Sequence, residues 1–378
     1  MVRRDICSRP SCCGGEDKAV GGRRHLSAEA LLMFEDIVTQ QQLDSITRLL
    51  QRTERIVVIG HQNPDGDAVG AVLGFMRWAS LINDEAEVQG VLPDAYPDFL
   101  QWLPCANTIM RYDKKSAEVS ALMENAGVLV CLDFNDYNRV GALEPILREY
   151  KGEIIHIDHH LNPTVKADIV VSNPQASSTS EMVLKMVIQN GDFDKMNRKF
   201  YIPIFTGMMT DTGNFSYSNA SPDTYYLVSE LLRKRVNREV IARNVYDNFS
   251  EWRLRLLGYV MNRKLVNISR LHASYFTLTR EEMLRFNFIR GDAEGLVNMP
   301  LQIKGQKLSI SLREDTTNPN IVWVSTRGAY DFPCDELCKR FYNGGGHSKA
   351  SGGKIYGTID DAVRITLDAI NYYAELLK

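Results

Sequence analysis

Residues 55–67 read Arg-Ile-Val-Val-Ile-Gly-His-Gln-Asn-Pro-Asp-Gly-Asp, an apolar run that passes into a turn carrying one histidine and two carboxylates. Short apolar runs bounded by turn residues are typical of buried strands. The arrangement recurs twice, because Asp133 follows the apolar residues 128–132 and Asp158 follows the apolar run 153–157. Each polar group therefore lies where a buried strand is expected to reach the surface.

Apolar runs alternate with longer amphipathic segments, such as 68–81 and 116–125, throughout residues 55–212. This alternation is typical of an α/β fold in which helices cover a mostly parallel sheet. Ligands bind such sheets at the carboxyl ends of the strands, where the polar groups lie. The segment 201–213 fits either a helix or a strand, but in both cases its end presents Asp211 close to a glycine.

The length of 378 residues predicts two domains, since one domain typically has about 100 to 200 residues. The second domain is expected to be a smaller α/β unit, because β-rich stretches alternate with helical pieces after residue 258. The expected parts are a disordered leader (1–26), a first α/β domain (27–220), a helical linker (221–258) and a second α/β domain (259–378).

The composition is that of an ordinary globular protein with a formal net charge of −3. Such a charge gives no global reason to bind long duplex nucleic acid or an anionic membrane. No apolar stretch approaches the roughly 20 residues of a membrane helix, and the first 25 residues lack the apolar core of a secretory signal. We expect a cytoplasmic protein, and the sequence leaves open whether it forms a homodimer.

Four carboxylates are expected at one sheet edge: Asp65, Asp67, Asp133 and Asp211. Each of these residues alone would be ordinary in a turn. Four carboxylates close together would repel one another unless cations bound between them. Two divalent cations would neutralise them. Mixed histidine and carboxylate ligation favours Mn²⁺, with Mg²⁺, Fe²⁺, Co²⁺ or Zn²⁺ as alternatives.

Two such ions about 4 Å apart are suited to phosphoester hydrolysis, since they stabilise the attacking and the leaving oxygen. His160 follows His159, and neighbouring side chains of an extended backbone point in different directions. With His159 as a ligand, His160 can contact the phosphate or protonate the leaving group. The alternative is that His160 only hydrogen-bonds to a ligand.

The segment Ser177-Ser-Thr-Ser-Glu181 precedes an apolar helix. It predicts a capping box, in which a Ser or Thr accepts from the helix amides and Glu181 reciprocates. A helix N-terminus that faces the metals could also hold a phosphate oxygen.

The order of these segments resembles the four motifs of the DHH phosphoesterase superfamily, which is named for the Asp158-His159-His160 triplet. The resemblance implies that Asp133 bridges the two metal ions and acts in catalysis, that His160 lies near the scissile phosphate, and that Asp158 is a supporting residue and not a direct ligand. The metal ligands it implies are His61, Asp65 and Asp133 for one ion, and Asp67, Asp133, His159 and Asp211 for the other.

The glycine-rich segment 343–354 is the second stretch of the sequence that indicates a binding site. Glycines allow a ligand close to the backbone amides, although a flexible hinge would also explain them. The segment resembles the signature of the DHHA1 domain, which accompanies the DHH domain in nucleotide-cleaving members. The substrate-binding residues that this resemblance implies are Arg313, Gly345, Gly346, His347 and Ser351.

Within the superfamily, the sequence is most similar to NrnA-type oligoribonucleases. This likeness implies hydrolysis of short single-stranded RNA or DNA, from dinucleotides upward, to mononucleotides, and of 3′-phosphoadenosine 5′-phosphate (pAp) to AMP. One alternative is a phosphodiesterase of cyclic di-AMP or its linear product pApA. An alternative of another class is a nucleotide-binding sensor without turnover, but this would predict a broken set of metal ligands.

Overall fold

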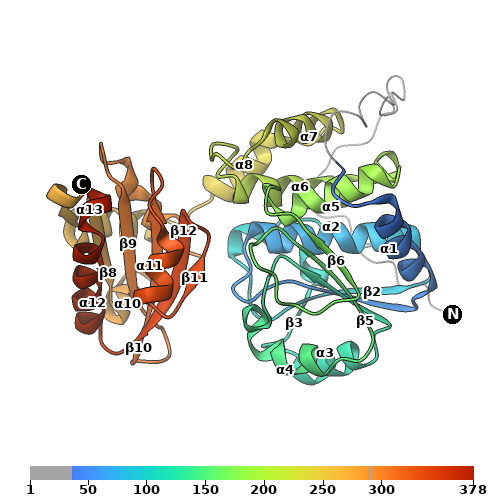
Figure 1. Ribbon diagram of the computed structural model, residues 1–378, viewed down its shortest axis with the longest axis horizontal. Helices are drawn as coiled ribbons and strands as arrows, with labels where there is room; N and C mark the ends of the chain where they lie inside the picture. Colours follow the sequence, from blue (N-terminus) through green and yellow to red (C-terminus); the bar gives the residue numbers. More distant parts are fainter. Residues whose placement is uncertain (1–35, 290) are drawn as a thin grey trace. The chain divides into compact units, whose positions relative to one another are not determined.

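The computed structural model describes residues 36–289 and 291–378. The chain forms two compact units, the first ending at Asn248 and the second spanning Phe249–Lys378 (Figure 1). The leader expected at residues 1–26 lies outside the described residues. The two units are described separately below.

A six-stranded sheet forms the centre of the first unit, and all its neighbouring strands are parallel. The strand order is β3-β2-β1-β4-β5-β6, so the direction in which strands are added reverses between β1 and β4. The α/β fold with a mostly parallel sheet is confirmed. The strands are β1 (Arg55–Ile59), β2 (Glu87–Leu92), β3 (Met110–Arg111), β4 (Val128–Leu132), β5 (Glu153–Asp158) and β6 (Ile169–Ser172).

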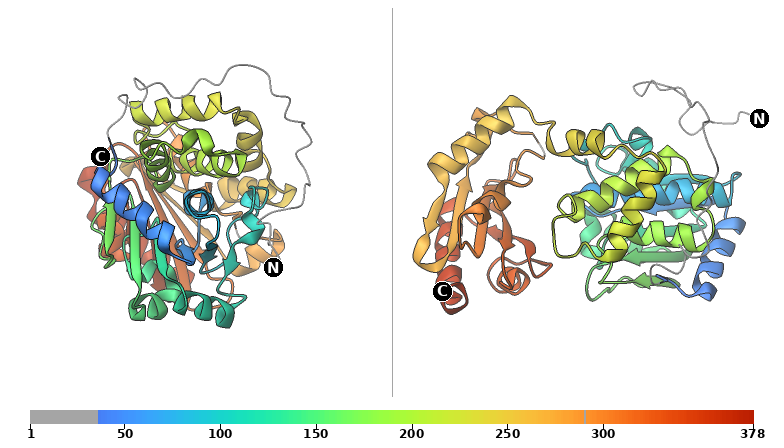
Figure 2. Two further views of the ribbon diagram at one scale, coloured as in Figure 1. Left: turned by 90° about the vertical axis from the view of Figure 1, so that its right-hand side faces the viewer. Right: turned by 90° about the horizontal axis from the view of Figure 1, so that it is seen from above.

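Helices cover both faces of this sheet (Figures 1 and 2). Alternate strand residues divide the core accordingly, since Ile56 and Val58 pack with α2, α5 and α6, whereas Val57 and Ile59 pack with α3 and α4. The segment that fitted helix or strand is helix α6. The helices are α1 (Gln40–Arg52), α2 (Gly66–Ile82), α3 (Ser116–Glu124), α4 (Glu144–Glu149), α5 (Thr179–Gln189), α6 (Arg198–Asp211), α7 (Pro222–Arg233) and α8 (Arg238–Tyr246), with 3-10 helices η2 (Asp98–Leu100), η3 (Ala106–Thr108), η4 (Tyr137–Leu143) and η5 (Phe193–Lys195).

Helix α2 is almost entirely buried, and it packs directly on α6 through glycines four residues apart. A Cβ added to Gly70 would lie 2.5 Å from the carbonyl oxygen of Pro203, and one added to Gly74 would lie 2.4 Å from Cδ1 of Ile204. These positions therefore have no room for a side chain. The contact holds the first turn of α2 beside the last turn of α6, since Gly66 faces Thr210.

The second unit contains a mixed six-stranded sheet of order β11-β12-β10-β9-β8-β7, in which only β8 and β9 are parallel. Helices α11 and α12 pack on one face of the sheet, and α9, α10 and η8 pack against β8 on the other. The elements are α9 (Glu251–Tyr259), η6 (Val260–Lys264), β7 (Val266–Ile268), η7 (Ser269–Leu271), β8 (Ala273–Leu278), α10 (Arg280–Arg285), η8 (Leu296–Gln302), β9 (Leu308–Glu314), β10 (Ile321–Gly328), α11 (Cys334–Phe341), β11 (Gly345–Gly346), β12 (Ala350–Tyr356), α12 (Ile359–Tyr372) and α13 (Ala374–Leu377).

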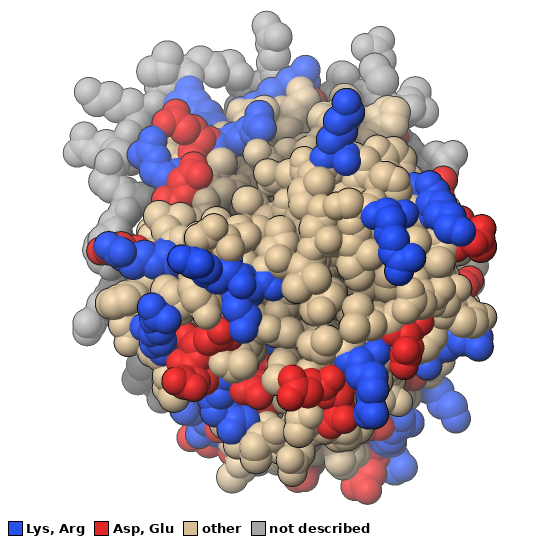
Figure 3. All heavy atoms as spheres, turned by 90° about the vertical axis from the view of Figure 1, so that its left-hand side faces the viewer, with Lys and Arg blue, Asp and Glu red and all other residues tan. Residues whose placement is uncertain are grey.

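Basic and acidic side chains are interspersed on the face of the second unit shown in Figure 3, around a broad area without charged side chains. Charges of both signs in close proximity largely cancel at a distance, so this face offers no strong field to a long polyanion. Among the described residues, no helix combines the length and the apolar character that crossing a membrane requires.

The close contact between α2 and α6 leads to a stability prediction. Gly70→Ala should lower the free energy of unfolding by about 1–3 kcal/mol, because the new methyl group meets backbone that cannot move aside cheaply. Gly258→Ala in α9 is the control, since a Cβ there meets nothing within 4 Å and alanine favours helix. Thermal unfolding measures the stability of both variants. Equal melting temperatures for Gly70→Ala and the unmodified protein would contradict this account of the packing.

Candidate metal centre

The polar residues singled out in the first unit meet at the carboxyl edge of its sheet. Asp133 directly follows β4 and His61 follows β1 after Gly60, and the strand order reverses between these two strands. In open α/β sheets this reversal opens a crevice in which ligands bind. Helix α2 begins beside Asp65 and contains Asp67, α6 ends at Asp211, and β5 leads into Asp158-His159-His160.

One group of possible metal ligands consists of His61, Asp65 and Asp133, whose ligand atoms all lie within 4.8 Å of one another. Nε2 of His61 is 3.5 Å from Oδ2 of Asp133 and 3.8 Å from Oδ1 of Asp65. Oδ1 of Asp65 also accepts from the amides of Asp67 and Ala68, at 3.0 and 3.1 Å. Asp65 therefore caps helix α2 as well as facing this group.

A second group consists of Asp67, Asp133 and His159, and these three residues are buried. Nε2 of His159 is 3.5 Å from Oδ1 of Asp133 and 3.6 Å from Oδ2 of Asp211, which places Asp211 at the border of the group. Asp133 belongs to both groups, with one oxygen facing each histidine. It is the residue best placed to contact two ions.

Separations of 3.5–3.8 Å exceed the length of a hydrogen bond between nitrogen and oxygen. They are close to the spacing of atoms that share an ion, because two ligands 2.0–2.2 Å from one ion lie roughly 3.3–3.6 Å apart at tetrahedral angles. The donor set of imidazole nitrogen and carboxylate oxygen therefore fits divalent metal ions.

Main-chain carbonyl groups fix the orientation of both histidine rings. Nδ1 of His61 lies 2.8 Å from the carbonyl oxygen of Gln62, and Nδ1 of His159 lies 3.2 Å from that of Ala176. A carbonyl oxygen can only accept, so Nδ1 carries a proton and Nε2 is the nitrogen that can bind an ion once it has lost its own proton. This is the tautomer that a metal ligand needs.

The first turn of helix α5 holds two of the acidic side chains. The amides of Thr179 and Ser180 donate to the carboxylate of Asp67 at 2.7 and 2.9 Å, and the Thr179 hydroxyl donates to Asp133 at 3.0 Å. These amides thus bind a protein carboxylate, whereas the sequence had suggested a phosphate oxygen as their partner. The sequence analysis missed Thr179, which only the cap pattern around it could have indicated.

The capping box expected at α5 is formed only in part. Ser178 is the N-cap and accepts from the amide of Glu181 at 3.0 Å. The side chain of Glu181 does not reciprocate, because it accepts from the hydroxyls of Ser177 and Thr224, at 2.6 and 2.7 Å. Glu181 is fully buried among these donors, so it ties α5 to α7.

The crowding of carboxylates changes their affinity for protons. Burial raises the pKa of Asp67 well above its usual value, and the charges of Asp133 and Asp211 add to this effect. Burial likewise raises the pKa of Asp211 to about 7, together with nearby negative charge. Burial would also raise the pKa of Asp133, but its interactions with His61 outweigh this and hold that pKa below the usual range.

The pKa of His159 depends more on its charged neighbours than on its burial. Burial alone would lower its pKa, but the carboxylates of Asp211 and Asp133 outweigh burial and raise the pKa to about 9. The ion-free cluster therefore retains protons near neutral pH, and a bound cation would have to displace them.

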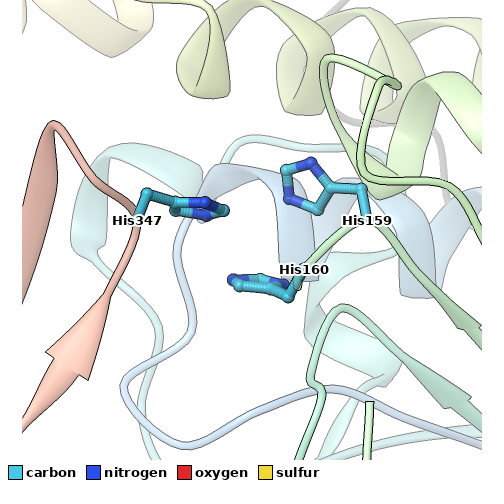
Figure 4. Close-up of side chains that lie close together, drawn as sticks. All are labelled: His159, His160 and His347. Carbon is cyan, nitrogen blue, oxygen red and sulfur yellow. The ribbon is translucent and has the colours of Figure 1, made fainter. Parts of the chain in front are cut away.

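His160 lies beside His159 but is held differently. Its Nδ1 is 2.7 Å from Oδ1 of the fully buried Asp158 and 3.8 Å from Oδ1 of Asp133. The rings of His159 and His160 stand edge to face, with centroids 4.8 Å apart (Figure 4). Asp158 thus orients His160, as the sequence analysis expected of a supporting residue.

The substrate-binding residues predicted for the second unit lie in its sheet or in a turn between its strands. Gly345 and Gly346 form β11, and Arg313 lies in β9. His347 lies in the turn after β11, where its main chain pairs with Ala350 and its carbonyl oxygen accepts from the Ser351 hydroxyl at 2.7 Å. The Ser351 hydroxyl therefore has a partner inside the hairpin.

Comparisons with known proteins place the chain in a family. The model described as "DHH family, N-terminal domain" matches residues 55–209. A crystal structure of an exopolyphosphatase-related protein from Bacteroides fragilis is 39% identical to this chain, covers 91% of this chain and 99% of its own, and superposes with a TM-score of 0.85. The chain belongs to the DHH family. The family predicted from the sequence is thereby confirmed.

Curated relatives from Thermus thermophilus and Bacillus subtilis carry the name "Bifunctional oligoribonuclease and PAP phosphatase NrnA". The one from Thermus thermophilus is 26% identical over 87% of this chain and 94% of its own length, and the one from Bacillus subtilis is 24% identical over 85% and 96%. As a DHH family member, the chain is a metal-dependent hydrolase that acts on phosphoester bonds.

The pKa shifts predict that metal binding releases protons. His159 and much of Asp211 are protonated at neutral pH without an ion, so Mn²⁺ affinity should rise from about pH 6 to about pH 9. Calorimetric titration in buffers of different ionisation enthalpy measures the protons released, which should decrease as pH rises. The Asp211→Asn variant should release fewer protons between pH 7 and pH 8, because it lacks the Asp211 proton and the charge that raises the pKa of His159. Equal proton release across the range would contradict the assignment.

Proposed function

We propose that this protein is a two-metal phosphoesterase that hydrolyses short oligonucleotides, from dinucleotides upward, to mononucleotides and converts pAp to AMP. The observation that carries the proposal is the position of Asp133, which faces both ligand groups at the point where the strand order reverses. The names of the two curated relatives describe the same pair of activities.

The ions that we propose are two divalent cations, with Mn²⁺ as the first candidate. When bound, they would generate a hydroxide at neutral pH and stabilise charge on the attacking and leaving oxygens. Mixed nitrogen and oxygen donors support Mn²⁺, and the buried carboxylates supply the charge that balances it. The proposed ligands are His61, Asp65 and Asp133 for one ion, and Asp67, Asp133, His159 and Asp211 for the other.

His160 is the proposed general acid. Hydrolysis joins the oxygen of water to phosphorus and breaks the bond between phosphorus and the leaving oxygen, which must then gain a proton. The 2.7 Å contact with Asp158 fixes one proton of His160 on Nδ1, which leaves Nε2 as the nitrogen that carries the exchangeable proton when the ring acts as an acid. His160 can then give the proton on Nε2 to the leaving oxygen.

We assign substrate binding to the second unit, through Arg313, Gly345, Gly346, His347 and Ser351. Arg313 supplies a permanent positive charge for phosphate. Gly345 leaves space beside its backbone, since an added Cβ would meet only the Lys339 side chain at 3.9 Å. The glycines at 344 and 353 have a different role, because their added Cβ atoms would strike backbone carbonyl oxygens at 2.0 and 2.3 Å.

The decisive assay is a substrate panel in Mn²⁺ that contains dinucleotides, longer oligonucleotides, pAp and cyclic di-AMP. We expect mononucleotides from the linear chains and AMP from pAp, and no turnover after metal removal with a chelator. Preferred hydrolysis of cyclic di-AMP would favour the phosphodiesterase alternative. Nucleotide binding without turnover in any divalent metal would instead identify a sensor.

Variants of two residues separate catalysis from binding. Asp133→Asn keeps the shape but removes the charge that faces both groups, so kcat should fall by at least about a thousandfold. Arg313→Gln should mainly raise KM, with Arg364→Gln on exposed α12 as the matched control. Steady-state kinetics on a dinucleotide measure all three. An equal loss of kcat in the Asp133 and Arg313 variants would mean that their roles are misassigned.

A further inference from the structure

A row of aromatic and basic side chains crosses the second sheet on the face opposite α11 and α12. Arg313 of β9 pairs with Trp323 of β10, and Trp323 pairs with Lys354 of β12. Their neighbours Leu312 and Val322 point into the core beneath the two helices, so the row lies on the other face. Phe288 extends the row beyond Arg313, and we call these four side chains the stacking row.

Aromatic rings and cations alternate along the stacking row. Nζ of Lys354 lies 5.4 Å from the centroid of the Trp323 ring, and the Arg313 guanidinium lies 5.5 Å from that of Phe288. All four side chains are half-buried, so each offers part of its surface to solvent. Adjacent strands are about 4.8 Å apart, which brings the rings and charges within reach of one small ligand.

The Trp323 ring is held in place by its polar edge. Its Nε1 donates to Oδ2 of Asp315 at 2.6 Å. The other oxygen of Asp315 accepts from the amides of Thr317 and Asn318, at 2.8 and 2.7 Å. A ring fixed in this way loses little conformational freedom when a flat ligand stacks on it.

Phe288 borders a cavity of about 240 Å³ at its end of the row. The cavity adds polar groups to an apolar wall, because Asn287 and Thr316 line it together with Met283 and Leu284. A mixture of apolar surface and a few amide or hydroxyl groups is typical of sites that bind flat heteroaromatic ligands.

We propose that the stacking row binds a short single-stranded nucleotide chain. Every base has a flat face that can stack on Trp323 or Phe288, and Arg313 and Lys354 can contact the phosphates. Such binding tolerates any sequence, since it uses the faces of the bases and not their edges. This inference rests on the proposed function and adds Trp323, Phe288 and Lys354 to its substrate residues.

Rows of this kind also stabilise sheets, because cross-strand aromatic and cationic pairs attract one another without a ligand. A loss of stability on substitution would therefore say nothing about a ligand. The test must measure how the effect of a side chain depends on the chemistry of the ligand.

Three dinucleotides provide that test with the full-length protein in a chelating buffer, where no turnover occurs. One carries both bases, one has an abasic 5′ sugar and one has an abasic 3′ sugar. Trp323→Leu should weaken binding of the intact dinucleotide by about tenfold. One of the two abasic ligands should show no such loss, because the base that stacks on Trp323 is missing. An equal loss for all three ligands would overturn the proposal.

The charge of Lys354 gives a second, independent measurement. Lys354→Gln should reduce the slope of log affinity against log salt concentration by about 0.7, the value expected for one phosphate contact to a single strand. Lys378→Gln is the matched control, because the exposed Lys378 pairs with Glu375 of α13, away from the stacking row and the glycine segment. Lys354→Gln also keeps the proposal testable if Trp323→Leu does not fold, because it leaves the Trp323 ring in place. Identical salt slopes for Lys354→Gln and the unmodified protein would contradict the phosphate contact.

The outcomes also separate this inference from the proposed function. If the unmodified protein binds the dinucleotides as expected but never hydrolyses them, the proposed function fails and the stacking row stands. If it hydrolyses dinucleotides while Trp323→Leu binds all three ligands normally, the stacking row fails and the proposed function stands.

Discussion

The buried carboxylate of Asp67 is the constraint around which the first unit is organised. A carboxylate loses several kcal/mol of hydration when it is buried, so it must find donors or cations inside the protein. The amides of Thr179 and Ser180 provide two donors at the positive end of helix α5. Helix α2 therefore cannot shift relative to α5 without exposing the charge, and its glycines keep it equally close to α6.

Asp133 meets a second constraint, which concerns the backbone. Its φ of 67° lies in the left-handed region, which a residue with a side chain seldom adopts. The amide of Asp133 donates to the carbonyl oxygen of Ile157 at 3.1 Å, so the neighbouring strand holds this conformation. The strained residue is also the one that faces both ligand groups, and strain of this kind is commonly kept where it serves function.

Sequence reasoning reached the parts of this structure that depend on local pattern. Apolar runs that end in acidic residues located β1, β4 and β5, and the order of the motifs indicated the family. Residues 201–213 stayed ambiguous because their pattern fits either a helix or a strand, and Gly207 is explained only by its close approach to Ser180 of α5 and Asp67 of α2. The hydroxyl of Thr179 and the diverted side chain of Glu181 escaped prediction because their partners are 46 and 43 residues away.

The candidate sites of the two units carry charges of opposite sign. The metal centre gathers carboxylates, which repel a phosphate chain until cations neutralise them. Attraction of the substrate must then come from the ions themselves or from fixed positive charges elsewhere in the chain. Arg313 and Lys354 carry such charges beside aromatic rings, on strands β9 and β12 of the second sheet. On the proposed assignment, affinity for a nucleotide and the ability to cleave it would vary independently, since different side chains would supply them.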